Sequence, residues 1–164
     1  MLTAERLREL LTYAPETGLF YWKVAPSNGR TVVGSVAGRV NDEGYRKIGI
    51  DGRVYAAHRL AYLYMPGEWP KELIDHENLA RDDNRWRNLR PATRTQNKAN
   101  SLPRSACGFK GVYITKKRGK IRWRAQIRAE GHLHSLGYYG TPEEANAAYA
   151  AAADKLFGEF ARAA

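Results

Sequence analysis

The N-terminal part of the chain alternates short apolar runs with turn-forming residues. Residues 3–12 carry leucines on one face of a predicted helix, with Thr3 in position to cap it. The stretch "APETGLFYWKV" predicts a turn and a strand. Residues 34–57 mix turn signals with β-branched and aromatic runs, which predicts a β-hairpin or meander. Residues 58–65, "HRLAYLYM", then show a helical apolar stripe.

The next stretch, residues 73–100, breaks this alternation. Its sequence, "LIDHENLARDDNRWRNLRPATRTQNKAN", is rich in Asn and Arg and poor in aliphatic residues. It predicts a short strand at "ELIDH" and a helix at "TRTQNKANS", capped by Thr93 or Thr95. So few apolar side chains bury too little surface for packing alone to explain the segment. We therefore expect its polar side chains to have partners outside the chain.

After the polar segment the pattern changes again. Residues 102–108 contain Pro, Gly and Ser and predict a linker between a first domain, residues 1–101, and a second, residues 109–164. The second domain contains three strand-like runs and a helix that Thr141 and Glu144 open with a capping box. The predicted fold class is α+β, with a three-stranded antiparallel sheet packed on one helix in the second domain.

The middle run of the second domain, "KIRWRAQIRA", alternates with a period of two. One face carries Arg122, Arg124, Gln126 and Arg128. The other face carries Ile121, Trp123, Ala125 and Ile127. The predicted helix has a matching small-residue face of Ala145, Ala148, Tyr149, Ala152 and Leu156. If the apolar faces pack together, the Arg row is free to bind an anion such as DNA. In the major groove of DNA, Arg can contact phosphate and recognise guanine. An exposed basic strand without a partner is the alternative.

The charge balance favours nucleic acid as a partner. Lys and Arg number 27 against 17 Asp and Glu, which gives a net charge of +10 and a pI near 9.9. No apolar run is long enough for a membrane span, and "MLTAERLREL" is too charged for a signal peptide. We expect an intracellular (cytoplasmic) protein without a membrane partner. A single cysteine, Cys107, excludes an internal disulfide and a multi-cysteine zinc site.

The polar segment contains the components of metal-assisted phosphodiester hydrolysis. Asp75 and Asn97 offer hard oxygen ligands suited to Mg²⁺ or Mn²⁺, and His76 can remove a proton from water. Neighbours on a regular strand face opposite ways, so Asp75 and His76 share a site only where the strand ends or bends. A hydrogen bond within a loop is the alternative explanation for the pair.

Several spaced motifs carry a family resemblance. The order "AHRL", "IDH", "NRWRNLR", "TQNKAN", within about residues 45–100, resembles the HNH nucleases of phage homing-endonuclease type. Their finger has the pattern D-H, N-L-R, N-x-x-N, and "LRELLTYAPETGLFYWK" is similar to a segment often joined to them. The resemblance implies a ββα-metal (His-Me) finger that uses a single divalent ion to nick or cleave double-stranded DNA.

The resemblance also implies roles for individual residues. Asp75 is expected to be a metal ligand and His76 the general base. Asn88 is expected to bridge the loop of the finger and hold His76 in place. Asn97, standing where many members have a third histidine, is expected to be the second metal ligand.

Other polar residues of the segment also have expected roles. His58 and Asn100 are possible accessory residues, although a packed histidine explains His58 equally well. Asn78 and Asn84 are expected to be cap or turn residues. The predicted phosphate contacts are Arg85, Arg87, Arg90 and Arg94, with a solvated basic face as the alternative.

The second domain resembles the plant APETALA and ethylene-response-factor DNA-binding domain over roughly residues 107–160. The matching stretches are "FKGVYI", "RWRAQIR", "LGYYGTPEEANAAYAAAA" and "FGEFA". The resemblance implies a sheet docked in the major groove, with DNA contacts from Lys110, Arg122, Arg124 and Arg128. "YIT" and "LHS" stand where the plant domains have further Arg and Trp, so base specificity of the plant type is not implied.

Two other functions remain open. A DNA-binding protein that keeps the HNH fold without activity is the main alternative to the endonuclease. An RNA-binding or nucleoprotein structural role fits the charge but leaves the Asp-His pair unexplained. The sequence does not determine the target site, the choice between a nick and a double-strand break, the preferred metal or the oligomeric state.

Overall fold

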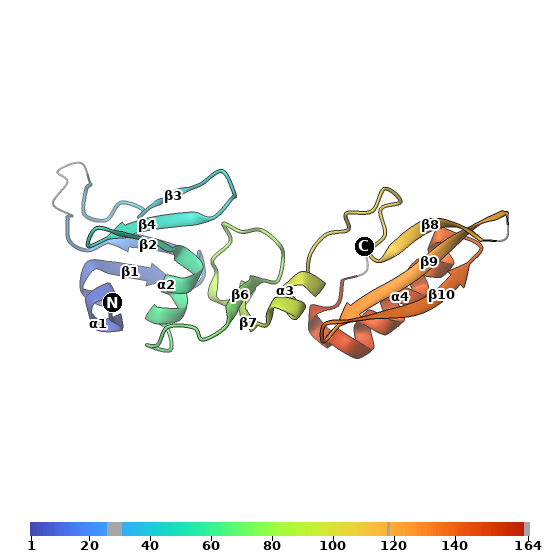
Figure 1. Ribbon diagram of the computed structural model, residues 1–164. Helices are drawn as coiled ribbons and strands as arrows, with labels where there is room; N and C mark the ends of the chain where they lie inside the picture. The colour runs from blue at the N-terminus through green and yellow to red at the C-terminus, as the bar shows by residue number, and fades with distance from the viewer. Residues whose placement is uncertain (26–30, 118, 163–164) are drawn as a thin grey trace. The chain divides into compact units, whose positions relative to one another are not determined.

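The computed structural model describes residues 1–25, 31–117 and 119–162, which form two compact units, residues 1–92 and 93–164. In the first unit the elements are α1 (Ala4–Leu10), β1 (Leu11–Ala14), β2 (Leu19–Trp22), β3 (Arg39–Val40), β4 (Arg46–Ile50), β5 (Arg53–Ala56), α2 (Ala57–Tyr64), β6 (Leu73–His76), η1 (Trp86–Asn88) and β7 (Leu89–Ala92) (Figure 1). In the second unit they are α3 (Arg94–Ala99), β8 (Val112–Lys117), β9 (Lys120–Ala129), β10 (His132–Tyr139), α4 (Pro142–Phe157) and η2 (Gly158–Phe160).

The first helix begins as expected but ends early. The Thr3 side chain accepts a hydrogen bond from the Arg6 backbone N–H, which confirms the predicted cap. The helix stops at Leu10, and Leu11 begins strand β1, whose alternate residues Leu11 and Tyr13 are buried. The predicted extension to residue 12 was wrong because the chain changes from helical to strand periodicity to pair with β2.

The core of the first unit gathers side chains from both helices and the three-stranded sheet. β3, β4 and β5 form an antiparallel meander, as the turn signals predicted. Within this unit α2 contacts β4 and β5 on one side and the loop before β7 on another (Figure 1). The fully buried core side chains include Leu7, Phe20, Ile48 and Leu60. This core is the platform on which strands β6 and β7 rest, through Ile74 and Leu89.

Strands β6 and β7 form the hairpin that carries the Asp-His pair. They pair antiparallel, with Asp75 opposite Arg90 and His76 opposite Leu89. Ile74 and Leu89 are buried in the core of the first unit, so each strand is anchored by one apolar side chain. The hairpin is therefore fixed at its base by packing, while its polar residues make specific contacts.

A close backbone contact joins the β1–β2 turn to the loop between β6 and β7. Gly18 has a φ of +74°, and a Cβ there would lie 2.4 Å from Asn84 C and Arg85 N. The Tyr13 hydroxyl donates to Asn84 O at 2.6 Å, and Trp86 N donates to Pro15 O at 2.9 Å. Glycine is required at residue 18 because any side chain would push the loop away.

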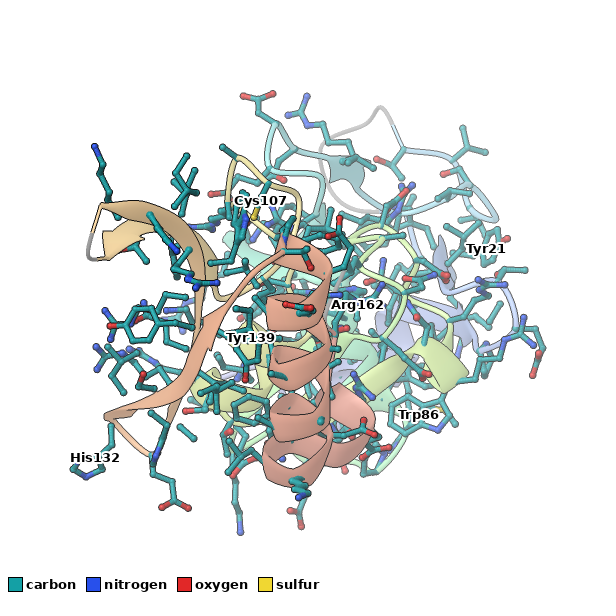
Figure 2. All side chains as sticks on the ribbon, turned by 90° about the vertical axis from the view of Figure 1, so that its right-hand side faces the viewer. Tyr21, Trp86, Cys107, His132, Tyr139 and Arg162 are labelled. Atoms are coloured by element: carbon teal, nitrogen blue, oxygen red, sulfur yellow. The ribbon has the colours of Figure 1, made fainter. Side chains whose placement is uncertain are left out.

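The second unit is a three-stranded antiparallel sheet, in the order β10-β9-β8, with α4 against one face. Figure 2 shows Tyr139 between the sheet and α4, and His132 at the far end of the β9–β10 hairpin. Thr141 and Glu144 form the predicted capping box at the start of α4. Thr93, rather than Thr95, caps α3. The predicted sheet and helix are confirmed.

Two details of the predicted packing in the second unit were wrong. Leu156 is 47% exposed and Ile121 is 63% exposed, so neither belongs to the apolar contact. Ala153 is buried and Phe157 packs beside it in the cluster that contains Tyr149. The buried stripe of α4 runs through Ala145, Tyr149 and Ala153, because the helix follows a strict i, i+4 path here.

The boundary between the units differs from the expected linker. The chain divides between Ala92 and Thr93, and residues 102–108 lie inside the second unit as the loop from α3 to β8. The Lys110 ammonium donates to the carbonyl oxygens of Ala99, at 2.5 Å, and Ser101, at 2.6 Å. These bonds hold the end of α3 to the start of the sheet. Every helix in the described part of the chain is too short or too polar to cross a bilayer.

Candidate active site

The Asp-His pair lies at the C-terminal end of β6, where the strand gives way to a turn. Asp75 is 2% exposed and His76 is 5% exposed. Asp75 Oδ2 accepts a hydrogen bond from Arg90 Nε across the hairpin at 3.0 Å. Two neighbouring side chains can share a site only where a strand ends or bends, and the pair lies at such a strand end.

The imidazole of His76 sits among other rings and an amide. The His58 ring, on α2, lies edge-on at 5.1 Å between centroids, and the Tyr45 ring lies at 6.1 Å. His76 Nε2 is 3.3 Å from Asn84 Oδ1. Because an amide oxygen only accepts, this bond requires Nε2 to carry the proton. The lone pair of the ring is then on Nδ1.

Burial keeps both histidines in the neutral form. It lowers the pKa of His76 below the usual value for an imidazole, although the bond to Asn84 and the charge of Asp75 oppose the change. Burial, with a smaller contribution from His76, lowers the pKa of His58 to about 3. A neutral imidazole at physiological pH is the form that can accept a proton from water.

Asn88 bridges the loop between β6 and β7. Its Nδ2 donates to Asp83 O at 2.7 Å, and its Oδ1 accepts from Asn78 N at 3.0 Å. The Asp83 carboxylate pairs with Arg85 and also accepts from Asn78 Nδ2 at 2.6 Å. Hydrogen bonds from Arg85 lower the pKa of Asp83 to about 2. Hydrogen bonds and an ion pair, rather than apolar packing, therefore hold the loop closed.

Asn84, expected to be a cap or turn residue, contacts His76 directly, whereas Asn88 forms the loop bridge that the resemblance implied. Asn84 is fully buried; its Nδ2 donates to Asp82 O at 3.0 Å while its Oδ1 faces His76. Asn78 is a turn residue as expected, since its Oδ1 accepts from Ala80 N at 2.9 Å. No local pattern distinguishes Asn84 from Asn78, because the partner of Asn84 lies eight residues away in a strand.

The comparisons with known proteins bear on this hairpin and its surroundings. Residues 55–99 match the model of the HNH endonuclease family. An uncharacterised HNH endonuclease of Acanthamoeba polyphaga mimivirus is 34% identical over 106 residues, which cover 63% of this chain and 54% of the relative. The chain thus spans about half the length of that curated relative. No solved structure matches the chain.

The HNH match, residues 55–99, begins in β5 and ends in α3, so it runs through His58, Asp75, His76 and Asn88. Asn97 also falls within it, with an exposed side chain on α3 in the second unit. Asn100 follows as the C-cap of α3, and its Oδ1 accepts from Arg162 Nε at 3.2 Å. The structure therefore gathers three of the four predicted catalytic residues in the first unit.

The arginines within the HNH match divide into two kinds. Arg85 pairs with Asp83 and Arg90 pairs with Asp75, so ion pairs inside the fold use both. Arg87 and Arg94 have exposed side chains. The predicted row of four phosphate contacts thus contains two arginines with structural partners, because acidic side chains lie beside them in the hairpin and its loop.

The donors within the HNH match fit a divalent ion in their chemistry. The buried Asp75 carboxylate is a hard oxygen donor, as is the amide oxygen of Asn97. His58 Nδ1, beside His76, is buried without a hydrogen-bond partner among the described residues. Across residues 1–25, 31–117 and 119–162, no group of three or more His, Cys, Asp or Glu side chains is arranged to hold a metal. The described residues therefore contain no cluster of several acidic side chains or thiolates that could hold a metal ion.

Beyond the HNH match, the second unit presents the predicted Arg row. Arg122 and Arg128 are exposed, whereas Arg124 and Gln126 are half-buried. In register, Tyr113 of β8 and Tyr138 of β10 lie on either side of Arg124. Lys110 is not part of this row, because its ammonium donates to two backbone carbonyls at the end of α3. The row therefore consists of strand β9 residues flanked by tyrosines.

Proposed function

We propose that the chain is a metal-dependent HNH endonuclease that binds double-stranded DNA and hydrolyses phosphodiester bonds. The observation that carries the proposal is the neutral His76, buried beside Asp75 at the end of β6 and held by Asn84, within residues that match the HNH endonuclease family. The viral origin of the relative supports a phage or mobile-element endonuclease of homing type.

His76 is the general base in this proposal. With its proton on Nε2, the ring accepts a proton from water at Nδ1. The water oxygen forms a bond to phosphorus as the bond from phosphorus to the 3′ oxygen breaks. The products are a 5′-phosphate and a 3′ oxygen that takes a proton from solvent. Asn84 fixes the tautomer and the ring plane, and Asn88 holds the loop that carries Asn84.

Asp75 and Asn97 are the proposed ligands of a single Mg²⁺ or Mn²⁺ ion. Such an ion stabilises negative charge on the scissile phosphate and on the departing oxygen when it is bound. Arg90 donates to Asp75 from the opposite strand, which orients the carboxylate and balances its charge. Asn97 supplies an uncharged oxygen, so the proposed site carries one carboxylate fewer than a two-acid site.

The second unit is proposed to hold the DNA through Arg122, Arg124, Gln126 and Arg128. Their strand carries cations on the face that α4 leaves uncovered. Exposed cations on such a face bind phosphate and release counterions, so binding depends on salt. The resemblance to plant DNA-binding domains in residues 107–160 supports the same role.

A DNA-binding protein without nuclease activity is the second candidate. The ion pair between Asp75 and Arg90 favours it, because an arginine already satisfies the carboxylate that the metal would need. Both candidates bind DNA, so only hydrolysis separates them.

A plasmid assay tests the proposal. Supercoiled plasmid is incubated with the protein in Mg²⁺, in Mn²⁺ or in EDTA, and nicked and linear forms are quantified over time. We expect cutting with a divalent ion, and a loss of about a hundred- to ten-thousandfold in His76→Ala. His132→Ala, at the exposed end of the β9–β10 hairpin, is the matched control and should cut normally. If the wild type binds plasmid but never cuts it, the second candidate is correct.

A further inference from the structure

A pocket of about 500 Å³ lies within the second unit, between α3 and the end of the sheet. One wall comes from α3, and the others come from the start of β8, the β9–β10 turn and two aromatic residues of α4, Tyr149 and Phe157. This volume falls within the range of small-molecule sites, roughly 300–1,000 Å³. The pocket includes Gln126 and Arg128 of the Arg row on β9, and the Asp-His pair of the first unit is not among its lining residues.

The charge of the pocket favours an anion. Of the described residues that line it, four are cationic, Arg94, Lys98, Lys110 and Arg128, and one, Glu130, is acidic. Lys110 anchors the wall through its two carbonyl contacts, and burial lowers the pKa of its ammonium to about 8. The other three cations have exposed side chains. Arg128 Nη1 donates to the carbonyl oxygen of Gly131, another lining residue, at 2.9 Å, which holds its guanidinium at the pocket. The guanidinium has further N–H groups to donate to a phosphate, as have Arg94 and Lys98.

A polar group in the wall has an unmet requirement. Gln126 Oε1 is buried without a hydrogen-bond partner among the described residues. A buried acceptor left unpaired destabilises the fold, and a donor supplied by a ligand would remove that penalty. The ligand should therefore carry an N–H or O–H group in addition to its negative charge.

An aromatic surface completes the wall. Tyr113, on β8, is 49% exposed and borders the pocket, and Leu133 lies at the opposite side of the sheet end. Exposed tyrosine rings on a sheet stack with the flat faces of bases. Inorganic phosphate would use neither this ring nor Gln126.

We propose that this pocket binds one unpaired nucleotide, with its phosphate at Arg94, Lys98 and Arg128 and its base between Tyr113 and Gln126. The base donates an exocyclic N–H to Gln126 Oε1, which favours adenine or cytosine over thymine. Two sources share this chemistry: a free nucleotide, or a nucleotide that has left the base stack of a bound DNA. Only the second source rests on the proposed function.

Titrations of the full-length wild-type protein in EDTA test the proposal without any cutting. Isothermal calorimetry compares dAMP, dTMP and inorganic phosphate, and fluorescence anisotropy compares a fully paired duplex with one that has a single bulged adenine. We expect dAMP to bind saturably, about fivefold more tightly than dTMP, and phosphate to bind more weakly than both. We also expect the bulged duplex to bind more tightly than the paired one.

Three variants connect the binding to the pocket. Tyr113→Ala should weaken dAMP roughly five- to a hundredfold, the effect of one stacked base. Gln126→Leu should abolish the preference for dAMP over dTMP while leaving the fold intact by circular dichroism. Lys120→Gln, on the same strand but outside the pocket, is the matched control for charge and should bind dAMP like the wild type.

The outcomes separate the sources and the failures. If dAMP fails to bind but Gln126→Leu removes a preference for the bulged duplex, the nucleotide comes from DNA and the proposal holds. If phosphate binds as tightly as dAMP, or no probe depends on Tyr113 and Gln126, the proposal is overturned. These titrations do not depend on the nuclease proposal, because EDTA removes the divalent ion and no DNA is cut in them. A protein that fails to cut plasmid can therefore still bind a nucleotide in the pocket.

Discussion

The two units use their polar residues in opposite ways. In the first unit Asp75, His76, Asn84 and Asn88 are buried, and specific hydrogen bonds hold their side chains. In the second unit Arg122 and Arg128 of the Arg row are exposed on a sheet face that α4 leaves uncovered, while Arg124 and Gln126 between them are half-buried. Buried polar groups are costly unless their geometry is fixed, whereas exposed cations cost little and adapt to a flexible partner.

The charge of the chain follows the same division. Residues 1–92 contain 14 Lys and Arg against 12 Asp and Glu, a net +2, while residues 93–164 contain 13 against 5, a net +8. Most of the electrostatic attraction expected for a partner such as DNA therefore belongs to the second unit. The near-neutral unit carries the candidate chemistry, where acidic residues are needed beside the histidine. Positive charge therefore indicates which unit is expected to bind DNA, but it does not indicate which unit carries the proposed reaction.

The largest expected effect comes from breaking the buried ion pair of the first unit. Asp75→Ala leaves the Arg90 guanidinium without its carboxylate and should lower the free energy of unfolding by about 3–5 kcal/mol. Urea unfolding followed by hydrogen exchange should show the loss in residues 1–92 and little change in the β8–β10 sheet. Asp51→Ala is the control, because its pair with Arg6 is exposed. Equal losses in the two variants would show that the buried pair is not special.

A smaller loss is expected from Gly18→Ala. The new Cβ meets the backbone of Asn84 and Arg85, and the positive φ adds about 1–3 kcal/mol of strain. Gly52→Ala has nearly the same φ, +76°, with nothing within 4 Å of its Cβ, so it isolates the strain. We expect Gly18→Ala to have the lower melting temperature and to lose plasmid cutting through displacement of Asn84. Identical melting curves would mean that the β1–β2 turn does not support the loop.

The second unit is tested by replacing Arg122, Arg124 and Arg128 with Ala. Every phosphate that the protein no longer neutralises should reduce the slope of log affinity against log salt by roughly one unit. Cutting should weaken because the protein dissociates, and a higher protein concentration should partly restore it. Lys155→Ala, on α4, removes a charge on the opposite side of the sheet and should leave the slope unchanged. An unchanged slope in the triple variant would move the DNA-binding surface to other residues.

The smallest effect is a pH dependence of stability in the first unit. His58 has a folded pKa of about 3, against roughly 6.5 when unfolded. Between these values the unfolded chain binds a proton that the folded chain excludes, so stability is full above about pH 6.5 and falls as the pH is lowered. His58→Phe should therefore lose fewer degrees of melting temperature than the wild type between pH 7 and pH 5.

The control for this pH experiment is His134→Phe, which replaces an exposed histidine on β10. It should keep the wild-type pH dependence. His76, Arg59 and Lys47 also face His58 and disfavour its protonation, so the comparison between variants matters more than either curve alone. If His58→Phe and the wild type lose stability in parallel, the acid sensitivity between pH 7 and pH 5 arises elsewhere, for example at His76, whose pKa burial also lowers.

Periodicity and capping residues determined most of the elements. The period-two alternation in "KIRWRAQIRA" predicted the two faces of β9 except at the exposed Ile121, and Thr141 with Glu144 predicted the start of α4, because these signals act between close neighbours in sequence. The Asp75-His76 pair, and its position at a strand end, were also predictable. Local rules failed where two elements compete for a residue, as at Leu11, which left the helix to pair with Trp22.

Only the tertiary structure decided which partner each polar side chain takes. Asn84 contacts His76, Lys110 binds the end of α3, and Arg90 serves Asp75 rather than solvent. The pocket of the second unit also has no local signature, since α3, α4 and one end of the sheet supply its walls. Residue type fixes what a side chain can donate or accept. Its partner depends on contacts distant in sequence, and these exist only after the core has brought the strands and helices together.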